Sequence, residues 1–411
     1  MTPALFDPVR HEPLIIEAWS TSDARICIEE IVNCAVQAYS PAHLFHPHPQ
    51  DDFLTGKSIG TSPYVGAAGV FWGIVHLSAA GAVPDQREWV RPRLDAMIAA
   101  NVDIGAGTGS LLFGGILALV LRAGLAPKTA AKDLDDVYAC LTQASAGPVQ
   151  EMMWGIPGGA LLAEFLLRQT GDTRWQDLLR RQLDAVWHAR IELPGIGLMW
   201  QEELYGSRTL YLGPVHGFAG QVLPLLRAFT LLSGEQQRVL RNEVPETLHR
   251  TALHDAQGIN WPTTAVADWS QAPRSAVGTL SACLVQYCHG APGIVTSFAD
   301  IRTDILPGID ELMRGGGELI WNAGPLAKGS NLCHGTAGNG MAFLKQFART
   351  GDQQWLERAR AFAMHSIRQY RQAKHHYGQD RYSLWTGDMG LAVYLQRCLD
   401  EVPAFPTVDV F

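Results

Sequence analysis

Hydrophobic positions along the chain repeat a two-helix pattern, which is clearest in two copies. Residues 158–186 and 338–367 each begin with an apolar stretch, turn at a Gly-Asp pair and continue as a more polar stretch with helical periodicity. The motif TGD-x-x-W marks the turn in both copies, at Thr170 and at Thr350. Because the first helix of each pair is apolar on nearly all sides, we expect it to be buried and its amphipathic partner to cover it.

Glycine pairs with the spacing G-x-x-G open these units. Each pair precedes an apolar stretch, and the pairs recur about every 54 residues, the length of two helices and their loops. Glycine at a helix start lets neighbouring backbones approach closely, as a narrow inner ring of helices requires. Seven such units predict an all-α fold of about fourteen helices. The pairs are Gly66/Gly69, Gly155/Gly158, Gly217/Gly220, Gly290/Gly293, Gly335/Gly338 and Gly387/Gly390, with a degenerate copy at Gly114-Gly115.

The burial expected of every first helix distinguishes two arrangements of these units. A linear solenoid leaves one face of its repeats in contact with water, whereas a closed ring buries all the first helices, so we expect a closed ring. Signals for strands are sparse, and residues 197–200 and 258–261 are candidates for hairpin-like loops between units. No linker rich in Pro, Ser or charge interrupts the chain. We therefore expect residues 1–411 to form a single domain, in which residues 1–60 are an N-terminal helix and loop leading into the repeats.

Composition and charge exclude several classes of protein. With 47% hydrophobic residues in a chain of 411, the sequence can bury a large core, which excludes a disordered chain. A net charge of −8 argues against a surface that binds nucleic acid. No apolar run approaches the roughly 20 residues of a membrane-spanning helix, and the first residues do not resemble a signal peptide. We therefore expect a cytoplasmic protein without a transmembrane segment.

Two short motifs carry residues that bind metals. Seven cysteines, an odd number in a chain without a secretory signal, argue against a disulfide framework and leave buried free thiols as the default. Yet Cys-His-Gly occurs at residues 288–290 and again at residues 333–335, each time at the first glycine of a pair, and His216-Gly217 keeps the histidine. In a closed ring, equivalent positions of the repeats converge at one end of the axis. We therefore expect these side chains to face one another.

On these motifs the chain resembles the lanthionine synthetase C-like proteins, from about residue 64 to residue 411. The resemblance rests on residues 288–293 (Cys-His-Gly-Ala-Pro-Gly), 332–338 (Leu-Cys-His-Gly-Thr-Ala-Gly) and 383–387 (Ser-Leu-Trp-Thr-Gly), together with His216-Gly217. The chain is more similar to the eukaryotic-type, glutathione-binding branch than to the bacterial cyclases. The features behind this are residues 284–290, Lys328-Gly329 and residues 403–406 (Pro-Ala-Phe-Pro).

The resemblance implies an α/α toroid of seven inner and seven outer helices with one Zn²⁺ at its mouth, held by Cys288, Cys333 and His334. Three protein ligands and one open position are the arrangement of a catalytic zinc site. Two thiolates cancel the charge of the ion, while the metal lowers the pKa of a substrate thiol that binds to it. This ligand set suits formation of a carbon–sulfur bond better than activation of water.

Three further residues match positions that have catalytic roles in the family. His216 resembles the acid/base histidine, and Glu151 lies where the cyclases have an acidic residue. Lys328 matches a lysine that contacts glutathione or stabilises the enolate. Each residue also has a plainer interpretation: a hydrogen-bonded core histidine, a solvated glutamate at a helix start, and a surface lysine. The chain departs from the family at Asp388, where relatives are usually neutral, and at Leu284, where the bacterial cyclases carry a basic residue for which Lys328 could substitute.

The resemblance implies an enzyme that uses Zn²⁺ to add a cysteine or glutathione thiol to dehydroalanine or dehydrobutyrine residues, forming a thioether of the lanthionine type. Its substrate would be a peptide or protein that a separate enzyme has dehydrated. The thiol would be either a cysteine of that peptide or glutathione, and glutathione agrees better with the eukaryotic-type branch. The alternative is a non-catalytic, zinc-containing protein that binds glutathione or a peptide. A glycoside hydrolase would need two carboxylates roughly 5–10 Å apart, and only Glu151 lies near the motif loops. A protein prenyltransferase would need a carboxylate ligand that these motifs lack.

Overall fold

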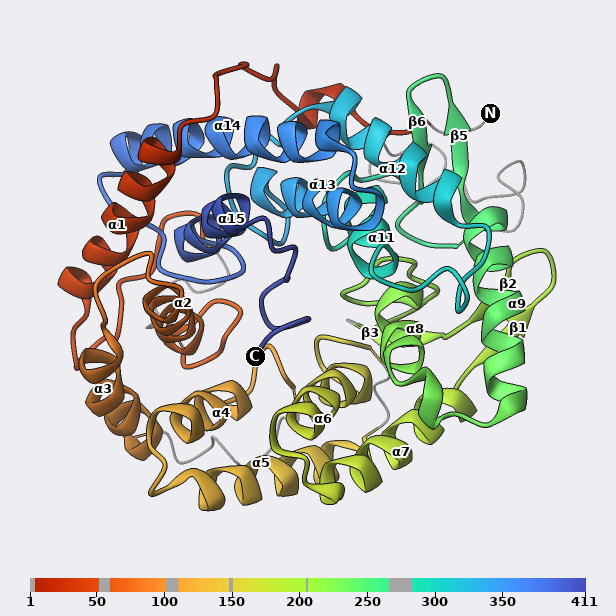
Figure 1. Ribbon diagram of the computed structural model, residues 1–411, viewed down its shortest axis with the longest axis horizontal. Helices are drawn as coiled ribbons and strands as arrows, with labels where there is room; N and C mark the ends of the chain where they lie inside the picture. The colour runs from red at the N-terminus through yellow and green to blue at the C-terminus, as the bar shows by residue number, and fades with distance from the viewer. Residues whose placement is uncertain (1–3, 52–59, 101–109, 148–150, 205, 266–282) are drawn as a thin grey trace.

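Two concentric rings of helices form the structure, which is a computed structural model of the chain (Figure 1). It describes residues 4–51, 60–100, 110–147, 151–204, 206–265 and 283–411. Within these residues the inner ring has seven helices: α2 (Ala67–Ala79), α4 (Ile116–Leu125), α6 (Ile156–Thr170), α8 (Phe218–Arg227), α11 (Ala291–Phe298), α13 (Thr336–Thr350) and α15 (Asp388–Asp400). The outer ring likewise has seven in the described part of the chain: α1 (Thr21–Ala38), α3 (Arg87–Ala100), α5 (Ala130–Ala144), α7 (Thr173–His188), α9 (Gly234–Thr251), α12 (Asp310–Ala323) and α14 (Gln353–Tyr377). The expected α/α toroid is thereby confirmed.

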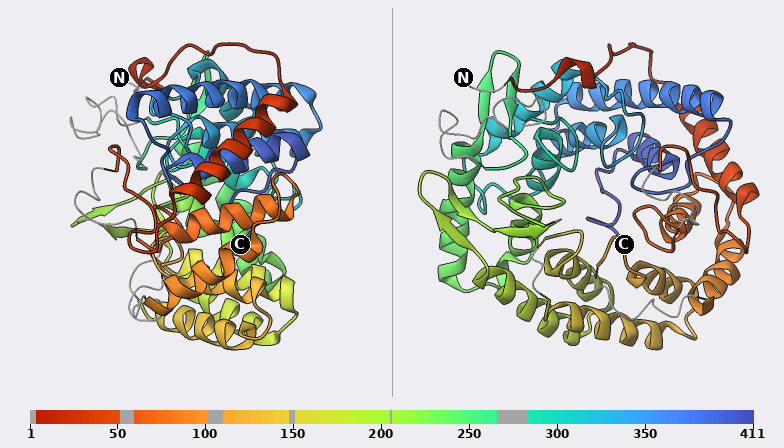
Figure 2. Two further views of the ribbon diagram at one scale, coloured as in Figure 1. Left: turned by 90° about the vertical axis from the view of Figure 1, so that its left-hand side faces the viewer. Right: turned by 180° about the vertical axis from the view of Figure 1, so that it is seen from behind.

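The ring closes where α15 meets α2. These two inner helices pack against each other, and α1, from the beginning of the described chain, covers α15 from outside. In the units that begin with α2, α4, α6, α11 and α13, the outer helix that follows covers the inner helix before it, as α7 covers α6 and α14 covers α13, whereas α9 packs on β2. Figure 2 shows the same closed ring from behind and from one side. A linear solenoid, the other arrangement that the repeats allow, is therefore wrong for this chain.

The repeated Gly-Asp turn joins an inner helix to its outer partner in two units. After α6, Gly171 adopts a left-handed backbone conformation with φ +66°, and the Asp172 carboxylate accepts a hydrogen bond from the backbone N–H of Arg174 at the start of α7. Gly351 and Asp352 do the same between α13 and α14. Since the glycine ends one helix and the aspartate caps the next, two residues suffice to reverse the chain.

Three antiparallel hairpins lie between the helices of the described chain. They pair β1 (Ile191–Leu193) with β2 (Gly197–Met199), β3 (Glu202–Leu204) with β4 (Ser207–Thr209), and β5 (Leu253–Asp255) with β6 (Gly258–Asn260). The strands β2 and β6 confirm the hairpin-like loops expected at these positions. Trp200 and Trp261, which follow them, are fully buried and donate their indole N–H groups to backbone carbonyls of α7 and α9. The hairpins are thus tied to the outer ring.

The second glycine of a G-x-x-G pair is required by a close approach of the backbone. Before each of these inner helices the chain folds back over the helix start, and the carbonyl six residues earlier comes to lie against this glycine. A Cβ atom at Gly338 would lie 1.8 Å from the carbonyl oxygen of Leu332, and one at Gly293 would lie 2.0 Å from that of Tyr287. The residue after each of these two carbonyls is the cysteine of a Cys-His motif. Packing at the glycine therefore fixes the position of the cysteine.

Replacement of Gly338 by Ala should destabilise the protein, because the added Cβ collides with backbone rather than with a movable side chain. Overpacking lowers the free energy of unfolding by about 1–3 kcal/mol. Because the neighbouring backbone cannot move aside, we expect a loss at the upper end of this range, about 3 kcal/mol. Gly124→Ala is the matched control, because position 124 in α4 has open space around a Cβ, and this change should stabilise by about 0.4–1 kcal/mol. Urea denaturation measures both. Equal free energies of unfolding would contradict the proposed packing.

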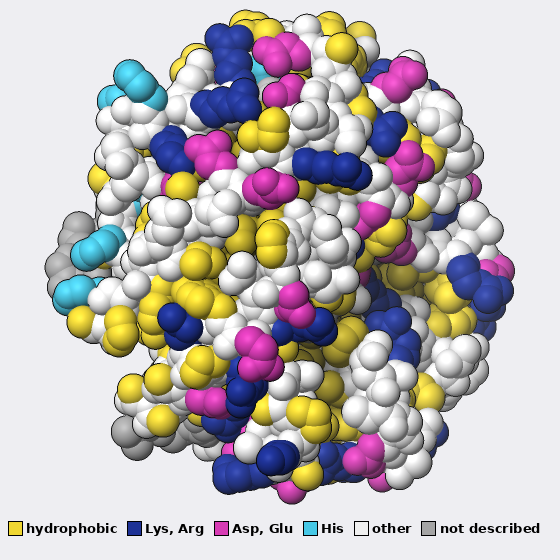
Figure 3. All heavy atoms as spheres, turned by 60° about the vertical axis from the view of Figure 1, so that its left-hand side comes forward, with side chains coloured by type: hydrophobic (Ala, Val, Ile, Leu, Met, Phe, Trp, Pro, Cys, Tyr) yellow, Lys and Arg dark blue, Asp and Glu magenta, His cyan; other side chains and the backbone are white. Residues whose placement is uncertain are grey.

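The outer surface carries mixed charges. On the face drawn in Figure 3, Lys and Arg side chains alternate with Asp and Glu. Among the side chains described on that face there is no broad basic area of the kind that binds a nucleic-acid backbone, which agrees with the net charge of −8. In the described part of the chain, no helix is both long enough and apolar enough to span a bilayer.

Candidate metal and acid–base site

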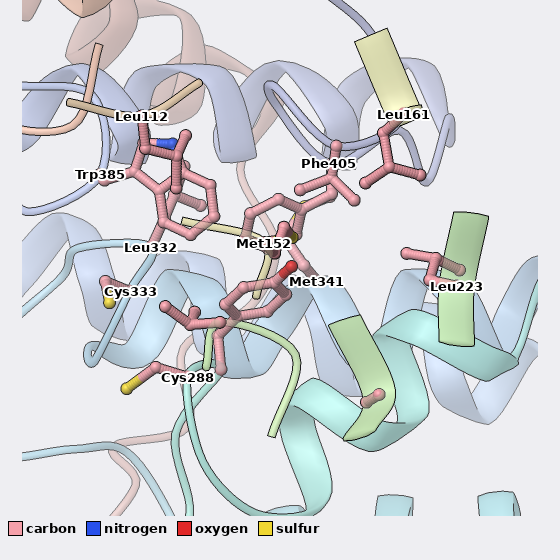
Figure 4. Close-up of a cluster of buried hydrophobic side chains, with 14 of the residues drawn as sticks. Leu112, Met152, Leu161, Leu223, Cys288, Leu332, Cys333, Met341, Trp385 and Phe405 are labelled. Atoms are coloured by element: carbon pink, nitrogen blue, oxygen red, sulfur yellow. The ribbon is translucent and has the colours of Figure 1, made fainter. Parts of the chain in front are cut away.

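The two motif cysteines lie together, although they come from loops that precede different helices, α11 and α13. The backbone N–H of Cys288 donates a hydrogen bond of 3.2 Å to the carbonyl of Cys333. Both side chains are nearly buried, with 8% and 2% of their surface exposed. Figure 4 shows the two sulfur atoms pointing the same way, away from the labelled hydrophobic side chains. Two adjacent repeats thus present a pair of thiols at one place.

Each sulfur also receives a hydrogen bond from a neutral donor. The hydroxyl of Tyr64 donates to Sγ of Cys333 and the side-chain amide of Gln286 donates to Sγ of Cys288, both at 2.9 Å. The neighbouring thiol of Cys333 lowers the pKa of Cys288, aided by Gln286 and by the charge of Lys328. The neighbouring thiol of Cys288, with burial, raises the pKa of Cys333. The pair therefore loses one proton readily and holds the second, as coupled neighbouring acids do.

His334 follows Cys333 directly and is half-buried. Its backbone N–H donates a 3.0 Å hydrogen bond to the side chain of Asn331. Burial, together with the charges of Lys328 and Arg381, lowers the pKa of His334 to about 3. The imidazole is therefore neutral at pH 7, which is the form that binds metals.

The structure provides residues of the types that bind zinc, but it does not hold them in a complete coordination site. Among the described residues, no group of three or more His, Cys, Asp and Glu side chains is arranged around one point as a metal site requires. Two buried thiols on loops that are hydrogen-bonded to each other, and a neutral imidazole on the next residue, are nevertheless donors that Zn²⁺ prefers. The residues present fit the ion by type.

His216 and Glu151 form an ion-pair geometry at the same end of the ring. Nδ1 of His216 lies 2.9 Å from Oε2 of Glu151. The glutamate is fully buried and also accepts the backbone N–H groups of Met153 and Trp154. Burial raises the pKa of Glu151, and these hydrogen bonds oppose the shift. The interpretation of Glu151 as a solvated glutamate is therefore wrong.

The carboxylate also fixes the orientation of the imidazole. An ionised carboxylate only accepts hydrogen bonds, so the neutral form of His216 carries its proton on Nδ1. Nε2 is then the basic nitrogen. Histidine with its second nitrogen held in this way can accept a proton and later return it.

The acid–base pair lies beside the cysteine loops. The backbone at Gly213, just before His216, packs so closely on Cys288 that a Cβ there would lie 2.1 Å from its carbonyl oxygen. The rings of His216 and His289 have centroids 6.3 Å apart, and Tyr211 lies 5.6 Å from His289. Nδ1 of His289 is buried and has no hydrogen-bond partner among the described residues. The thiol pair and the acid–base pair therefore occupy adjacent loops.

Lys328 lies on the loop between α12 and α13 and is exposed. Its charge acts on Cys288, Cys333 and His334, which places the ammonium group near all three. It also lines a cavity of about 250 Å³. The charged side chains around this cavity are Glu12, Lys328, Lys374, Arg381 and Asp388. Lys374 is already paired with Glu30 and Asp380, and Arg381 with Asp51. Lys328 is thus the cation around this cavity for which the described residues hold no ion pair, and it can bind a carboxylate of a ligand.

Tyr64 belongs to the site although neither Cys-His motif includes it, and its position in the sequence carries a signal. It stands five residues before Gly69, the second glycine of its pair, just as Cys288 stands before Gly293 and Cys333 before Gly338. Equivalent repeat positions converge, so a tyrosine at this position is brought to the sulfurs by the same geometry that unites them. No repeat position in the sequence marks Gln286, because the contact of its side-chain amide with Cys288 depends only on the conformation of one loop.

Replacement of Tyr64 by Phe should weaken zinc binding by about tenfold, the lower end of what losing an outer hydrogen-bond partner costs a metal site. The change removes the hydroxyl that donates to Cys333 but keeps the ring that stacks on Trp385. Tyr138→Phe on the outer helix α5 is the control and should bind zinc as the wild type does. Competition with a chromophoric chelator measures both affinities. Wild-type affinity in the Tyr64 variant would show that this hydrogen bond does not serve the site.

Comparisons with known proteins agree on one family. The sequence model of the family described as lanthionine synthetase C-like protein matches residues 195–410. The glutathione S-transferase LANCL1 of Danio rerio is 32% identical over 156 residues, which are 37% of this chain and 34% of that protein. The LanC-like protein GCL1 of Arabidopsis thaliana is 39% identical over 88 residues, 21% of this chain and 20% of that protein. The chain thus spans about a third or less of the curated relatives it matches.

A solved structure extends the likeness to nearly the whole fold. Nisin cyclase superposes with a TM-score of 0.60, covering 92% of this chain and 99% of its own, at 16% identity. At this identity the likeness concerns the fold. The family match includes His216, Lys328 and the two Cys-His motifs, whereas Glu151 lies before it.

Proposed function

Because the chain belongs to the lanthionine synthetase C-like protein family, we propose that it is a zinc-dependent enzyme that adds a thiol to a dehydroamino acid residue. The thiol joins the β-carbon of dehydroalanine or dehydrobutyrine, and the product is a thioether. The contact between Cys288 and Cys333, with the His216–Glu151 pair in the neighbouring loop, is the observation that carries this proposal.

Cys288, Cys333 and His334 would hold the zinc. When bound, the ion supplies the Lewis acidity that lowers the pKa of a substrate thiol and keeps its sulfur nucleophilic near pH 7. The hydrogen bonds from Tyr64 and Gln286 hold the two protein sulfurs in place.

His216 moves the proton. Addition of the sulfur to the β-carbon breaks the carbon–carbon π bond and leaves the electron pair on an enolate, whose α-carbon then needs a proton. Nε2 of His216 accepts the proton of the thiol and returns it to the α-carbon, so the atoms balance without any other reagent. Glu151 keeps the proton on Nδ1 and stabilises the imidazolium between the two transfers.

The cavity beside Lys328 would take the polar part of the thiol substrate. Glutathione carries two carboxylates and one ammonium group, and the cavity offers Lys328, which has no ion pair among the described residues, together with the carboxylates of Glu12 and Asp388. The relative from Danio rerio bears the name of a glutathione S-transferase. These observations favour free glutathione over a cysteine of the same peptide as the thiol that this chain uses.

Mass spectrometry of a dehydroalanine peptide incubated with glutathione and zinc-loaded protein tests the proposal. We expect a mass gain of one glutathione, formed faster than in the buffer control. A second peptide with its own cysteine, incubated without glutathione, reports ring formation as loss of the free thiol at unchanged mass. No acceleration in either reaction, with zinc present at one per chain, would contradict the enzyme and leave the non-catalytic zinc protein that binds glutathione or a peptide.

A further inference from the structure

The segment after α15 turns into the hollow of the ring. α15 ends at Asp400, and Glu401 caps it with a left-handed backbone at φ +60°. Figure 1 shows the chain running from there to the middle of the ring, where its last residue lies. Val402 is exposed at the entry, whereas Phe405, Thr407 and Val408 are almost completely buried. We call residues 405–409 the axial segment, since they occupy the centre that the inner helices surround.

The axial segment touches the loop that carries Cys288. The ring of Phe405 stacks on that of Tyr287, with centroids 4.1 Å apart and an interplanar angle of 19°. Tyr287 directly precedes Cys288, and its carbonyl is the one packed against Gly293. Figure 4 shows Phe405 within the hydrophobic cluster next to Cys288. The stack therefore supports the first cysteine from the side of the axis.

The axial segment also supports the loop that carries Cys333, through Trp385. The indole N–H of Trp385 donates a 2.9 Å hydrogen bond to the hydroxyl of Thr407. The carbonyl of the same tryptophan accepts the backbone N–H groups of Leu332, at 3.1 Å, and Cys333, at 2.9 Å. Trp385 is fully buried, so its position depends on these contacts. Both cysteine loops thus rest on one short piece of chain.

Buried charges anchor the axial segment. Asp409 pairs with Arg227 on α8 and with Lys345 on α13, the latter at 2.7 Å, and it also accepts the backbone N–H of Phe405. Lys345 is 1% exposed. Burial raises the pKa of Asp409, but the cations of Lys345 and Arg227 outweigh it and lower the pKa to about 2. The anchor is therefore charged throughout the neutral range. Lys345 also pairs with Asp300, so two cations and two carboxylates balance, and loss of any one of them would leave a charge uncompensated.

We infer that the axial segment is a positioning device that holds the Cys288 and Cys333 loops together, in the arrangement where the backbone N–H of Cys288 reaches the carbonyl of Cys333. It acts through Tyr287 on one loop and through Trp385 on the other, without contacting substrate. A segment that only filled space would not need a hydrogen bond to the tryptophan that carries Cys333. This inference rests on the proposed function only where zinc binding is measured, because the contact between the two cysteine loops does not depend on the metal.

Thr407→Val tests the inference, because it keeps the branched shape and removes the hydroxyl that accepts from Trp385. Thr407→Ser, which restores a hydroxyl, is the matched control. The reduced, zinc-free full chain is titrated with phenylarsine oxide, which bridges two neighbouring thiols and so reports their separation. We expect about tenfold weaker binding of the arsenical and of Zn²⁺ by the Val variant, the size of effect seen when a group supporting a metal ligand is lost. The Ser variant should bind as the wild type does.

A thermal melt of each variant separates positioning from stability. A lower melting temperature with unchanged arsenical affinity in Thr407→Val would overturn the inference, since the segment would then stabilise the ring without setting the thiols. Phe405→Leu gives a second test through the other loop and should also weaken arsenical binding, whereas unchanged binding would count against the inference. If the wild type binds the arsenical but not Zn²⁺, the proposed function fails while the positioning role is still measured.

Discussion

Replacement of Cys333 by Ala should leave the protein without stoichiometric zinc and without thiol-addition activity. Cys333 and Cys288 lie on loops that are hydrogen-bonded to each other, and a single sulfur with one imidazole cannot hold the ion against chelators. We expect affinity to fall by more than about 100-fold, since loss of an outer partner alone costs up to that amount. Metal analysis after dialysis against a chelator measures the effect.

The control for this change is Cys140→Ala in the outer helix α5, which removes a buried thiol away from the site. It should retain zinc and activity. A circular dichroism spectrum and thermal melt of both variants verify that the ring is folded. Zinc retained at one per chain in Cys333→Ala would show that the assigned ligands are wrong.

Replacement of His216 by Gln should lower the rate of thioether formation by about 10²–10⁴-fold while zinc stays bound, the range that a positioned acid–base group contributes. The imidazole is oriented by the buried Glu151, and glutamine offers no group that can take up and return a proton at neutral pH. Single-turnover kinetics with a dehydroalanine peptide separate this chemical step from binding.

His188→Gln on the outer helix α7 is the matched control, because His188 is exposed and hydrogen-bonds to a backbone carbonyl of its own helix. It should react at the wild-type rate. Glu151→Gln should lower the rate by less than the His216 change, since the amide oxygen still accepts from Nδ1 but cannot offset the charge of the imidazolium. A wild-type rate in His216→Gln would assign the proton transfers to another group.

The ring itself could be predicted because its signals are local and repeated. Each G-x-x-G pair marks a place where the backbone approaches a helix start, and the pairs recur from Gly66 to Gly390. Burial of the first helix in every unit then requires a closed arrangement. The equal repeat positions of Cys288 and Cys333 also predict that the two residues meet, and the structure places them in contact. The metal between them stays a prediction.

The parts that could not be predicted depend on contacts between distant segments. The burial of Glu151 follows from loops that fold over it, and a helix-start glutamate looks the same in sequence whether it is solvated or enclosed. For the axial segment, the sequence showed only a resemblance to the family, at residues 403–406. No local sequence pattern indicates that Phe405 packs against Tyr287, which is distant in the sequence. The third donor, His334, is placed next to the sulfurs by the sequence, but its ring direction depends on packing.

X-ray absorption spectroscopy at the zinc edge, on the full chain loaded with one zinc, is the sharpest test of whether Cys288, Cys333 and His334 hold the ion. We expect two sulfur neighbours at about 2.3 Å and one imidazole nitrogen at about 2.0–2.1 Å, with a lighter atom in the remaining position. A first coordination sphere of oxygen and nitrogen alone, with no sulfur, would contradict the proposed ligand set.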